Sequence, residues 1–271
     1  MHARLAFIGG GNMAGAIFGG LLRSGWPAAA ISVVEPGAEQ RERIAAAWPG
    51  VTLLPAADAS LATAEIVVWA VKPQSFAEAA AACAGGIAGD IAGALQLSVM
   101  AGIRSEAIAR ASGSERVVRA MPNTPALIGQ GIAGLVARAA VSEADRASVE
   151  AVLAPTGQML WLDREDQLDA VTAISGSGPA YVFYFIEAMM QAAEQMGLTL
   201  EQGRTLAQAT FAGATALAMQ SDESPATLRE RVTSKGGTTF AALESMRADH
   251  VQQAIVRALL AARQRAVELG R

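Results

Sequence analysis

The residues best suited to chemistry in this chain form a glycine-rich motif close to its start. The motif fits G-x-G-x-x-A, in which Gly9 permits a tight turn, Gly11 lets the backbone approach a pyrophosphate, and Ala14 allows close packing of a helix on a strand. The helix that begins here presents unpaired N–H groups and a partial positive charge to phosphates. A glycine turn without a ligand is the alternative, but the motif joins a predicted strand to a predicted helix, as dinucleotide binding requires. The predicted cofactor-binding residues are Ile8, Gly9, Gly10, Gly11, Asn12, Met13 and Ala14.

Glu35 stands at the end of the second predicted strand, where an acidic side chain can accept hydrogen bonds from the hydroxyls of an adenosine ribose. This position favours NAD(H) over a cofactor that carries a 2′-phosphate. Arg41 and Arg43 follow closely, and these cations could neutralise a 2′-phosphate. The choice between NADH and NADPH therefore stays open, as does the simpler interpretation of Glu35 as a solvated carboxylate.

Two more polar clusters follow predicted strands, at the sheet edge where ligands gather in open α/β folds. The first contains one of the only two lysines in the chain, which could face a phosphate, the nicotinamide ribose or simply solvent. The second is a loop made rigid by two prolines, which could aim polar groups into a cleft or form a plain turn. The predicted binding residues are Ala70, Val71, Lys72 and Pro73 in the first cluster, and Met121 and Asn123 in the second.

A further cluster combines a serine, two glycines and two threonines just before a predicted helix. Consecutive glycines expose backbone N–H groups, and the threonines can cap the helix or offer hydroxyls to a ligand. This composition suits an anion such as a substrate carboxylate, with a capped turn between helices as the simpler alternative. The predicted substrate-binding residues are Ser234, Gly236, Gly237, Thr238 and Thr239, together with Asn123.

The chain lacks the base that oxidation of a hydroxyl requires. His2 is terminal, His250 lies at a polar helix end, and the helix expected after Gly178 holds neither histidine nor lysine. No cluster of cysteine and histidine indicates a metal site. Reduction of a C=N bond is less demanding, because an iminium can arrive already protonated. That reaction needs a carboxylate clamp and a neutral hydrogen-bond donor more than it needs a base.

Alternating strands and helices position these clusters over residues 1–163. Apolar runs predict strands at residues 3–8, 31–35, 51–54, 66–71, 95–99, 116–120, 132–137 and 159–162. Helices are predicted at residues 12–24 and 38–47, from Pro73, between the fifth and sixth strands, and after Ser142, which could cap the last of them. The alternation predicts an α/β fold with a Rossmann-type, doubly wound, mostly parallel sheet covered on both faces.

Residues 164–271 are predicted to form an all-helical domain for dimerisation and substrate binding. Helical runs are expected at 166–174, 179–197, 200–220, 225–232 and 239–269, with breaks near 176–179, 197, 221–225 and 236–237. Residues 181–190 and 210–219 are apolar nearly all round, which requires burial. A helical domain of this size has a limited interior, so a second subunit is the expected cover.

The composition excludes several classes of protein. The chain is 52% hydrophobic and 17% charged, which is too apolar for a disordered protein. A net charge of −4 gives no reason to bind nucleic acid or an anionic membrane. No apolar stretch reaches the ~20 residues of a membrane helix, and the run at residues 5–8 is too short for a secretory signal. With a single cysteine, Cys83, these features predict a soluble cytoplasmic protein.

Taken together, the motifs resemble those of the pyrroline-5-carboxylate reductase family. The resemblance runs along essentially the whole chain, through FIGGGNMA, AVKP, RAMPNTPA, AISGSGPAYVF and VTSKGGTTFAAL. It implies reduction of (S)-1-pyrroline-5-carboxylate to L-proline with NADPH or NADH, the last step of proline biosynthesis. It also implies an N-terminal dinucleotide-binding domain, a C-terminal helical dimerisation domain, and homodimers that often assemble into decamers.

The resemblance further implies roles for single residues. Residues 8–13 and 70–73 would contact the cofactor, and the loop 121–125 would border the nicotinamide. Ser234 and residues 236–239 would hold the substrate carboxylate, while Thr239, or Thr238 beside it, would act catalytically by hydrogen bonding to the ring nitrogen. Two positions depart from the family pattern, because proline is common where Lys235 stands and a small polar residue is common where Glu35 stands.

Two other kinds of function stay open as alternatives. A β-hydroxyacid dehydrogenase or an imine reductase would share this architecture. The missing lysine and histidine argue against the dehydrogenase, and the GGTT sequence favours a carboxylated cyclic imine over other imines. A non-catalytic NAD(P)-binding oligomeric protein is the second alternative, and it would leave the GGTT sequence unexplained.

Overall fold

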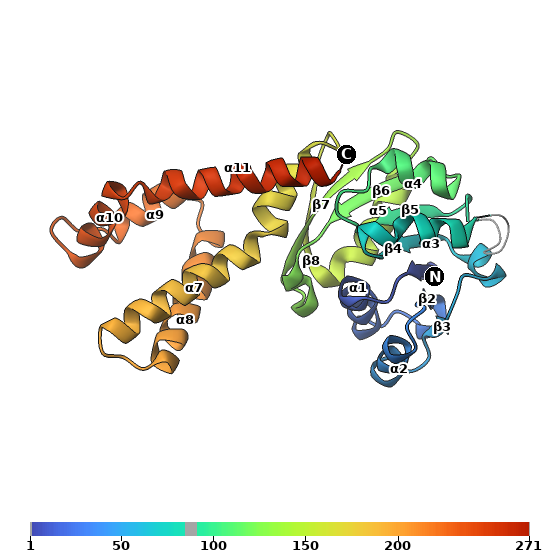
Figure 1. Cartoon of the computed structure of the whole chain (residues 1–271), viewed down its shortest axis with the longest axis horizontal. Helices are drawn as coiled ribbons and strands as arrows, with labels where there is room; N and C mark the ends of the chain where they lie inside the picture. Colours follow the sequence, from blue (N-terminus) through green and yellow to red (C-terminus); the bar gives the residue numbers. More distant parts are fainter. Residues whose placement is uncertain (1, 85–90, 271) are drawn as a thin grey trace. The chain divides into compact units, whose positions relative to one another are not determined.

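The computed structural model describes residues 2–84 and 91–270. Contacts between residues group the chain into two compact units (Figure 1). The first unit comprises Met1–Ser177 with Ala262–Arg271, and the second comprises Gly178–Ala261. All the strands that the structure describes lie in the first unit, and the second unit is helical.

The first unit is built on an eight-stranded sheet with the strand order β3-β2-β1-β4-β5-β6-β7-β8. Neighbouring strands run parallel except β6 and β7, so the prediction of a mostly parallel, doubly wound sheet is confirmed. The strands are β1 (Leu5–Ile8), β2 (Ile31–Val34), β3 (Thr52–Leu54), β4 (Ile66–Trp69), β5 (Leu95–Ser98), β6 (Val117–Met121), β7 (Gly131–Ala137) and β8 (Gly157–Trp161).

The antiparallel pairing of β6 with β7 follows from the short connection between them. Only residues 122–130 separate these strands, and they hold a single 3-10 helix, η4 (Thr124–Ile128). A parallel crossover needs a dozen or more residues, so the chain can only turn back beside the strand that it has just left. The rigid loop predicted after the sixth strand is this reversal.

Apolar side chains on both faces of the sheet form two buried layers, as predicted for a sheet covered on both sides. Phe7 and Val68 pack in the layer that includes helices α1 (Asn12–Arg23) and α5 (Glu143–Leu153). Their neighbours Ile8 and Trp69 point the other way, toward α3 (Phe76–Cys83) and α4 (Ser105–Ser112). Alternate residues of a strand face opposite sides, so continuous apolar runs indicate burial on both.

The remaining helices of the first unit also match their expected places. Helix α2 (Ala38–Ala47) has the predicted bounds. Pro73 begins a 3-10 turn, η3 (Pro73–Ser75), which leads directly into α3. Short 3-10 turns also occur at η1 (Ala28–Ala30), η2 (Ala59–Thr63) and η5 (Ala154–Thr156).

Ser142 caps α5 as predicted, and it does so within a reciprocal capping box. The Ser142 hydroxyl accepts a hydrogen bond from the Asp145 backbone N–H at 3.2 Å, and the Asp145 carboxylate accepts one from the Ser142 N–H at 3.0 Å. Arg116, just before β6, donates to the same carboxylate, with its Nε 3.2 Å from Oδ2. The hydrogen bond from Arg116, against the effect of burial, lowers the pKa of Asp145 to about 2, with Ser142 adding to the effect.

We expect Asp145 to stabilise the fold in a pH-dependent way. Its native pKa lies below that of an ordinary carboxyl, so its contribution is present above about pH 4 and is lost as the pH falls toward 2. The shift corresponds to about 2 kcal/mol. Urea unfolding at pH 7 and pH 3 should therefore show a smaller loss of stability on acidification for Asp145→Asn than for the wild type.

Glu143→Gln is the matched control for this prediction, because Glu143 lies in the same helical turn and is almost fully exposed. Removing that charge should change the free energy of unfolding by no more than ~0.5 kcal/mol at either pH. An identical acid dependence in Asp145→Asn and wild type would refute the assigned role of Asp145.

The break predicted near residues 176–179 lies between two helices in the structure, but the π-helical end of the first one was not predicted. Helix α6 (Gln167–Val171) continues into one π-helical stretch, η6 (Thr172–Gly176), and α7 (Gly178–Gln195) begins after Ser177. The Ser177 N–H donates to the Thr172 carbonyl at 2.8 Å, which is the wider bond of a π turn. Pro179 is the second residue of α7, where its missing N–H would have no helical partner in any case.

The last predicted helix is divided in the structure, so its prediction as one helix over 239–269 is wrong. Helix α10 (Thr238–Ala248) ends at Asp249, and α11 (Val251–Leu269) begins after His250. His250 has φ of 53°, a left-handed conformation that aspartate, asparagine and histidine adopt more readily than most other residues. The other two helices are α8 (Leu200–Met219) and α9 (Pro225–Arg231), close to their predicted bounds.

Helices α7 and α8 pack against each other, with the rings of Phe185 and Phe211 6.4 Å apart. Much of their apolar surface is nevertheless open in the single chain. Tyr184 is 73% exposed and Met219 is 67% exposed. Across residues 2–84 and 91–270, no helix combines the length and apolarity needed to cross a membrane.

Candidate active site

The loops with predicted cofactor residues meet at one point of the sheet. The chain runs outward from β1 through β2 to β3 and then returns to start β4 on the other side of β1. Strands β1 and β4 are parallel neighbours, so the loops that follow them leave the same edge in opposite directions. Ligands of open α/β sheets bind at this kind of switch point.

Gly9 makes the contact between these two loops. It has φ of +101°, and its N–H donates to the Val34 carbonyl at 2.9 Å. A Cβ at Gly9 would lie 2.8 Å from the carbonyl oxygen of Ala70. The Ala70 N–H donates in turn to the Ile8 carbonyl at 2.9 Å. The turn after β1 and the turn after β4 therefore touch through their backbones, which only glycine allows.

The start of α1 is open to an anion. Gly11 is its N-cap and supplies no side-chain acceptor, and the first turn holds no acidic residue. Gly11 and Asn12 are exposed, Met13 is partly buried, and Ala14 is fully buried against the sheet. A Cβ at Gly11 would meet no atom within 4 Å, so the space beside the helix start is free. Unpaired N–H groups at the positive end of a helix, beside free space, fit the pyrophosphate of a dinucleotide.

Glu35 is tied to the glycine loop. Its Oε2 accepts a hydrogen bond from the Gly10 N–H at 3.0 Å, and its Oε1 accepts one from the Gly37 N–H at 2.8 Å. Gln40, in the first turn of α2, donates from Nε2 to the Gly10 carbonyl at 2.7 Å. Sequence reasoning missed Gln40, because a glutamine in a helical turn carries no signal of what it will reach.

The loop after β4 brings Ala70 and Val71, two of its four predicted residues, into contact with the glycine loop. Val71 lies 3.0 Å from the position of a Cβ at Gly9. Lys72 is the exposed N-cap of the turn that Pro73 begins. Its charge therefore faces solvent at the carboxyl edge of the sheet, where it can reach a bound phosphate or ribose.

The loop after β6 is braced by Asn123. The Asn123 Oδ1 accepts from the Ile132 N–H at 3.0 Å, and its Nδ2 donates to the Ser175 carbonyl at 3.1 Å. Met121 ends β6, and its Cε lies 2.9 Å from the position of a Cβ at Gly176. Asn123 thus links the reversal between β6 and β7 to the π-helical stretch, a positioning contact that spacing alone does not reveal.

A buried ion pair on β6 also escaped the sequence reasoning. The Arg119 side chain is 5% exposed, and its Nη1 lies 2.8 Å from Glu165 Oε1. The backbone N–H and hydroxyl of Ser105, at the start of α4, both donate to the Glu165 carboxylate, at 2.6 and 2.7 Å. Burial lowers the pKa of Arg119, and Glu165 partly offsets that effect. Burial acts to raise the pKa of Glu165, but the hydrogen bonds from Ser105 and Arg119 together hold it below its usual value.

This pair joins the centre of the sheet to the segment that enters α6. The signal available in the sequence was an arginine inside the otherwise apolar strand VVRAM, since a buried charge requires a partner. Nothing in the sequence identifies that partner as a glutamate 46 residues away.

The predicted substrate residues lie in the second unit, apart from Asn123. Residues 232–237 connect α9 to α10, and Gly237 is the N-cap of α10 with no side-chain cap. Gly236 has φ of +75°, and a Cβ at Gly237 would lie 2.7 Å from the Ser234 hydroxyl oxygen. Thr238 and Thr239 form the exposed first turn of α10. Uncapped N–H groups and three hydroxyls gather here, which can bind a carboxylate.

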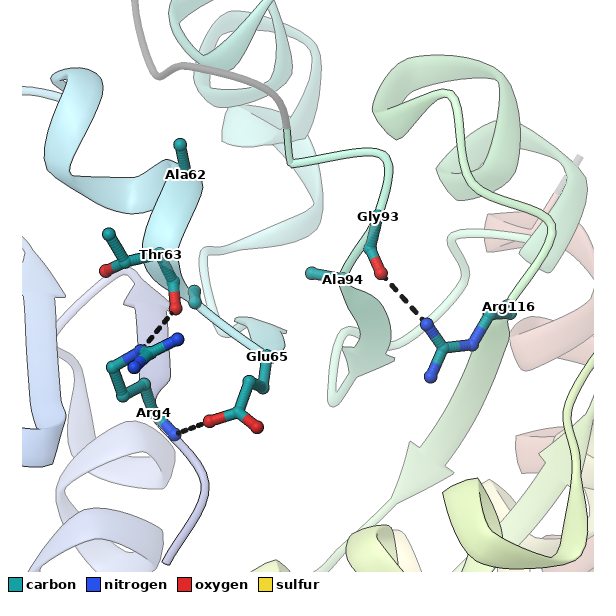
Figure 2. Close-up of a pocket in the computed structure, with 8 residues that line it drawn as sticks. Arg4, Ala62, Thr63, Glu65, Gly93, Ala94 and Arg116 are labelled. Atoms are coloured by element: carbon teal, nitrogen blue, oxygen red, sulfur yellow. Dashed lines mark hydrogen bonds between the residues drawn. The ribbon is translucent and has the colours of Figure 1, made fainter.

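Hollows among the described residues of the first unit include two that bear on the site. One, of about 230 Å³, adjoins the glycine loop and is lined by Gly10, Gly11, Gln40 and Arg43 among others. The other, of about 390 Å³, is shown in Figure 2 and lies at the amino ends of the strands, the edge opposite the cofactor loops. There Arg4 donates to the Thr63 carbonyl and Arg116 to the Gly93 carbonyl, so both cations are engaged by the chain itself (Figure 2). No group of three metal-binding side chains occurs in the part of the chain that the structure describes.

Comparisons with known proteins find matches along nearly the whole chain. Residues 165–269 match a family described as pyrroline-5-carboxylate reductase dimerisation, and residues 4–102 match one described as NADP oxidoreductase, coenzyme F420-dependent. The chain is 44% identical to a pyrroline-5-carboxylate reductase of Pseudomonas aeruginosa, covering 98% of this chain and 97% of that one. It is 42% identical to the same-named enzyme of Haemophilus influenzae, covering 99% and 98%.

Solved structures of pyrroline-5-carboxylate reductases also resemble this chain. A pyrroline-5-carboxylate reductase of Coxiella burnetii superimposes with a TM-score of 0.89 at 33% identity, covering all of both chains. A pyrroline carboxylate reductase of Plasmodium falciparum, solved with NADP bound, has a TM-score of 0.84 at 25% identity and covers 99% of this chain and 98% of that one.

Proposed function

The chain belongs to the pyrroline-5-carboxylate reductase family, and we propose from this premise how its residues carry out the reaction. The protein catalyses the NAD(P)H-dependent reduction of (S)-1-pyrroline-5-carboxylate to L-proline. It is an oxidoreductase of proline biosynthesis that forms a homo-oligomer through its helical region. The observation that carries the proposed roles is the pair of uncapped helix starts, one at Gly11 and one at Gly237.

The first of these starts is assigned to the cofactor. The N–H groups of residues 11–14 would hold the pyrophosphate, and Gly9 keeps the turn close to Ala70. Lys72 would face a phosphate or the nicotinamide ribose, with Val71 and Pro73 beside it and Met121 bordering the nicotinamide. The bound NAD(P)H supplies a hydride.

The second helix start is assigned to the substrate. The backbone N–H groups of Gly236 and Gly237, with the Ser234 hydroxyl, would clamp the carboxylate. Thr239 or Thr238 would form a hydrogen bond with the ring nitrogen while the hydride adds to the carbon of the C=N bond. Because the imine arrives protonated, no side chain has to donate a proton when the hydride adds to carbon, and the proposed residues include no acid or base.

The assignment to domains is part of the same proposal. Residues 1–163 would bind the dinucleotide, and residues 164–271 would bind substrate and form the dimer. The family match over 165–269 and the exposed apolar side chains of α7 and α8 support the second assignment.

Burial raises the pKa of Cys83 to about 11, which keeps its thiol protonated and inert. One cysteine and no membrane-crossing helix among the described residues support a cytoplasmic location.

A substrate comparison tests the proposed function. Oxidation of NADH and NADPH is followed at 340 nm (the nicotinamide absorbance) with pyrroline-5-carboxylate, ketopantoate and a cyclic imine without a carboxylate. We expect turnover with pyrroline-5-carboxylate and much weaker or no turnover with the other two. Preference for ketopantoate would indicate a hydroxyacid dehydrogenase, preference for the plain imine an imine reductase, and cofactor binding without turnover a non-catalytic protein.

A further inference from the structure

We propose that this enzyme prefers NADH to NADPH, because the chain fixes the Glu35 carboxylate beside the glycine loop, where an adenosine ribose would bind, and engages Arg41 with backbone carbonyls. The inference rests on the proposed function for the identity of the reaction. It concerns a separate property, the adenosine half of the cofactor, which takes no part in the chemistry.

The position of the Glu35 carboxylate is set by the backbone on both sides. Gly10 donates to one oxygen at 3.0 Å and Gly37 to the other at 2.8 Å. Gln40 adds another hydrogen bond to the glycine loop by donating to the Gly10 carbonyl at 2.7 Å. The side chain is half-buried between the glycine loop and the turn after β2. It cannot swing away without losing both hydrogen bonds, so the charge stays where the ribose hydroxyls bind.

The hydrogen-bonding capacity of this carboxylate matches a ribose and opposes a phosphate. An ionised carboxylate accepts about four hydrogen bonds, and the backbone uses two of them. The remaining two suit the 2′- and 3′-hydroxyls, which are donors. A 2′-phosphate offers acceptor oxygens and carries about −1.5 to −2 charges at pH 7. The phosphate and the Glu35 carboxylate would therefore repel each other, with no hydrogen available to form a hydrogen bond between them.

The two arginines that could neutralise such a phosphate have partners in the structure. Arg41 donates from Nη1 to the carbonyls of Glu35 and Pro36, both at 2.8 Å, and so supports the turn itself. Arg43 is paired with Glu39 one helical turn before it, but this pair is exposed and Arg43 lines the hollow beside the glycine loop, so the pair by itself does not exclude a phosphate. The segment 35–43 contains three glutamates and two arginines, so it stays net negative whichever pairs form. The fixed Glu35 carboxylate and the net negative charge of this segment favour NADH, a choice that the order of residues leaves open.

Binding of the oxidised cofactors to the enzyme tests the inference without turnover. We measure the Kd of NAD⁺ and NADP⁺ by isothermal titration calorimetry, and kcat/KM for NADH and NADPH with pyrroline-5-carboxylate. NAD⁺ should bind at least about tenfold more tightly than NADP⁺, with the same preference in kcat/KM. Equal affinity, or tighter binding of NADP⁺, overturns the inference whatever the variants show.

Three variants identify the cause of the preference. Glu35→Ser removes the charge and should reduce the NAD⁺ preference by about tenfold or more, mainly by tightening NADP⁺. Glu35→Asp keeps the charge and should keep the preference. Glu39→Gln is the matched control, since it removes one negative charge from the same segment and frees Arg43. It should change the ratio by less than about threefold. A shift in Glu39→Gln as large as that in Glu35→Ser would overturn the role of Glu35.

Failure of the proposed function would give results different from those of a wrong cofactor preference. In that case NAD⁺ would still bind more tightly than NADP⁺, but pyrroline-5-carboxylate would not be reduced with either cofactor. Reduction with both cofactors, together with tighter binding of NADP⁺, would instead leave the function standing and overturn the cofactor preference. Thermal unfolding of each variant shows whether a loss of affinity reflects loss of the fold, and the wild-type ratio decides the inference by itself.

Discussion

The Gly9→Ala variant is expected to lose measurable cofactor binding and about 3 kcal/mol of folding free energy. Two independent costs add at this position. The backbone has φ of +101°, where a side chain is strained, and the new Cβ would lie 2.8 Å from the Ala70 carbonyl oxygen. Because that neighbour is backbone, the turn after β1 and the turn after β4 must move apart. Denaturant unfolding and calorimetric titration with NAD⁺ and NADP⁺ measure the two effects.

Two further glycines separate these costs. Gly25 also has a positive φ, of +93°, but a Cβ there would meet nothing within 4 Å. Gly25→Ala should therefore lose only about 1 kcal/mol and bind cofactor normally. Gly11 has an ordinary φ of −72° and open space at its Cβ. Gly11→Ala should unfold like the wild type while the Kd of the cofactor rises by about 10- to 100-fold.

This set of three variants makes the assignment of the loop refutable. Normal cofactor affinity in both Gly9→Ala and Gly11→Ala would show that the pyrophosphate does not bind at the start of α1. Equal destabilisation in Gly9→Ala and Gly25→Ala would show that the contact with Ala70 is unimportant and that only backbone strain matters.

The Thr239→Ala variant is expected to reduce kcat by about 10²- to 10³-fold, an effect of the size found when one hydrogen-bonding group is removed from a reacting centre. The Kd of the cofactor should change by less than about twofold, because the proposed hydrogen bond of Thr239 is with the substrate ring and not with the cofactor. Stopped-flow measurement of hydride transfer and calorimetric titration of the cofactor measure the two quantities separately.

Conservative replacements distinguish the hydroxyl from the shape of the side chain. Thr239→Ser keeps the hydroxyl and should retain most of the activity, whereas Thr239→Val keeps the shape and should behave like the alanine variant. Thr238→Ala shows which of the two threonines acts on the ring nitrogen. Parallel losses of turnover and cofactor affinity in Thr239→Ala would indicate a misfolded loop rather than a catalytic role.

Much of the fold could be predicted because it depends on short stretches of sequence. The apolar runs of β1 and β4 contain their own signal, as do the glycines that end β1 and the capping box of Ser142 and Asp145. Each of these features involves residues within a few positions of one another. The chemistry of the Gly236 and Gly237 loop is local in the same way, and so is the family resemblance that such motifs carry.

The ends of the helices were harder to predict, because the same residue types can either continue a helix or end it. Gly176 and Pro179 indicate a break, and α7 does begin at Gly178, but nothing in the sequence indicates the π turn that ends at Gly176. The segment around His250 has no glycine or proline, yet the helix ends there. In both places local preference makes the observed backbone conformation possible but does not demand it.

The sequence alone determined the strand–helix plan and the glycine loop after β1, and it suggested the proposed anion site before α10, because adjacent residues specify each of them. Only the tertiary structure decided that the Glu35 carboxylate binds the Gly10 N–H 25 residues away, and that Arg119 pairs with Glu165. The folded backbone also gives Arg41 its carbonyl partners and turns β7 antiparallel to β6. Hydrogen bonds and ion pairs require atoms within about 3 Å, and for residues distant along the chain that proximity exists only once the sheet has formed.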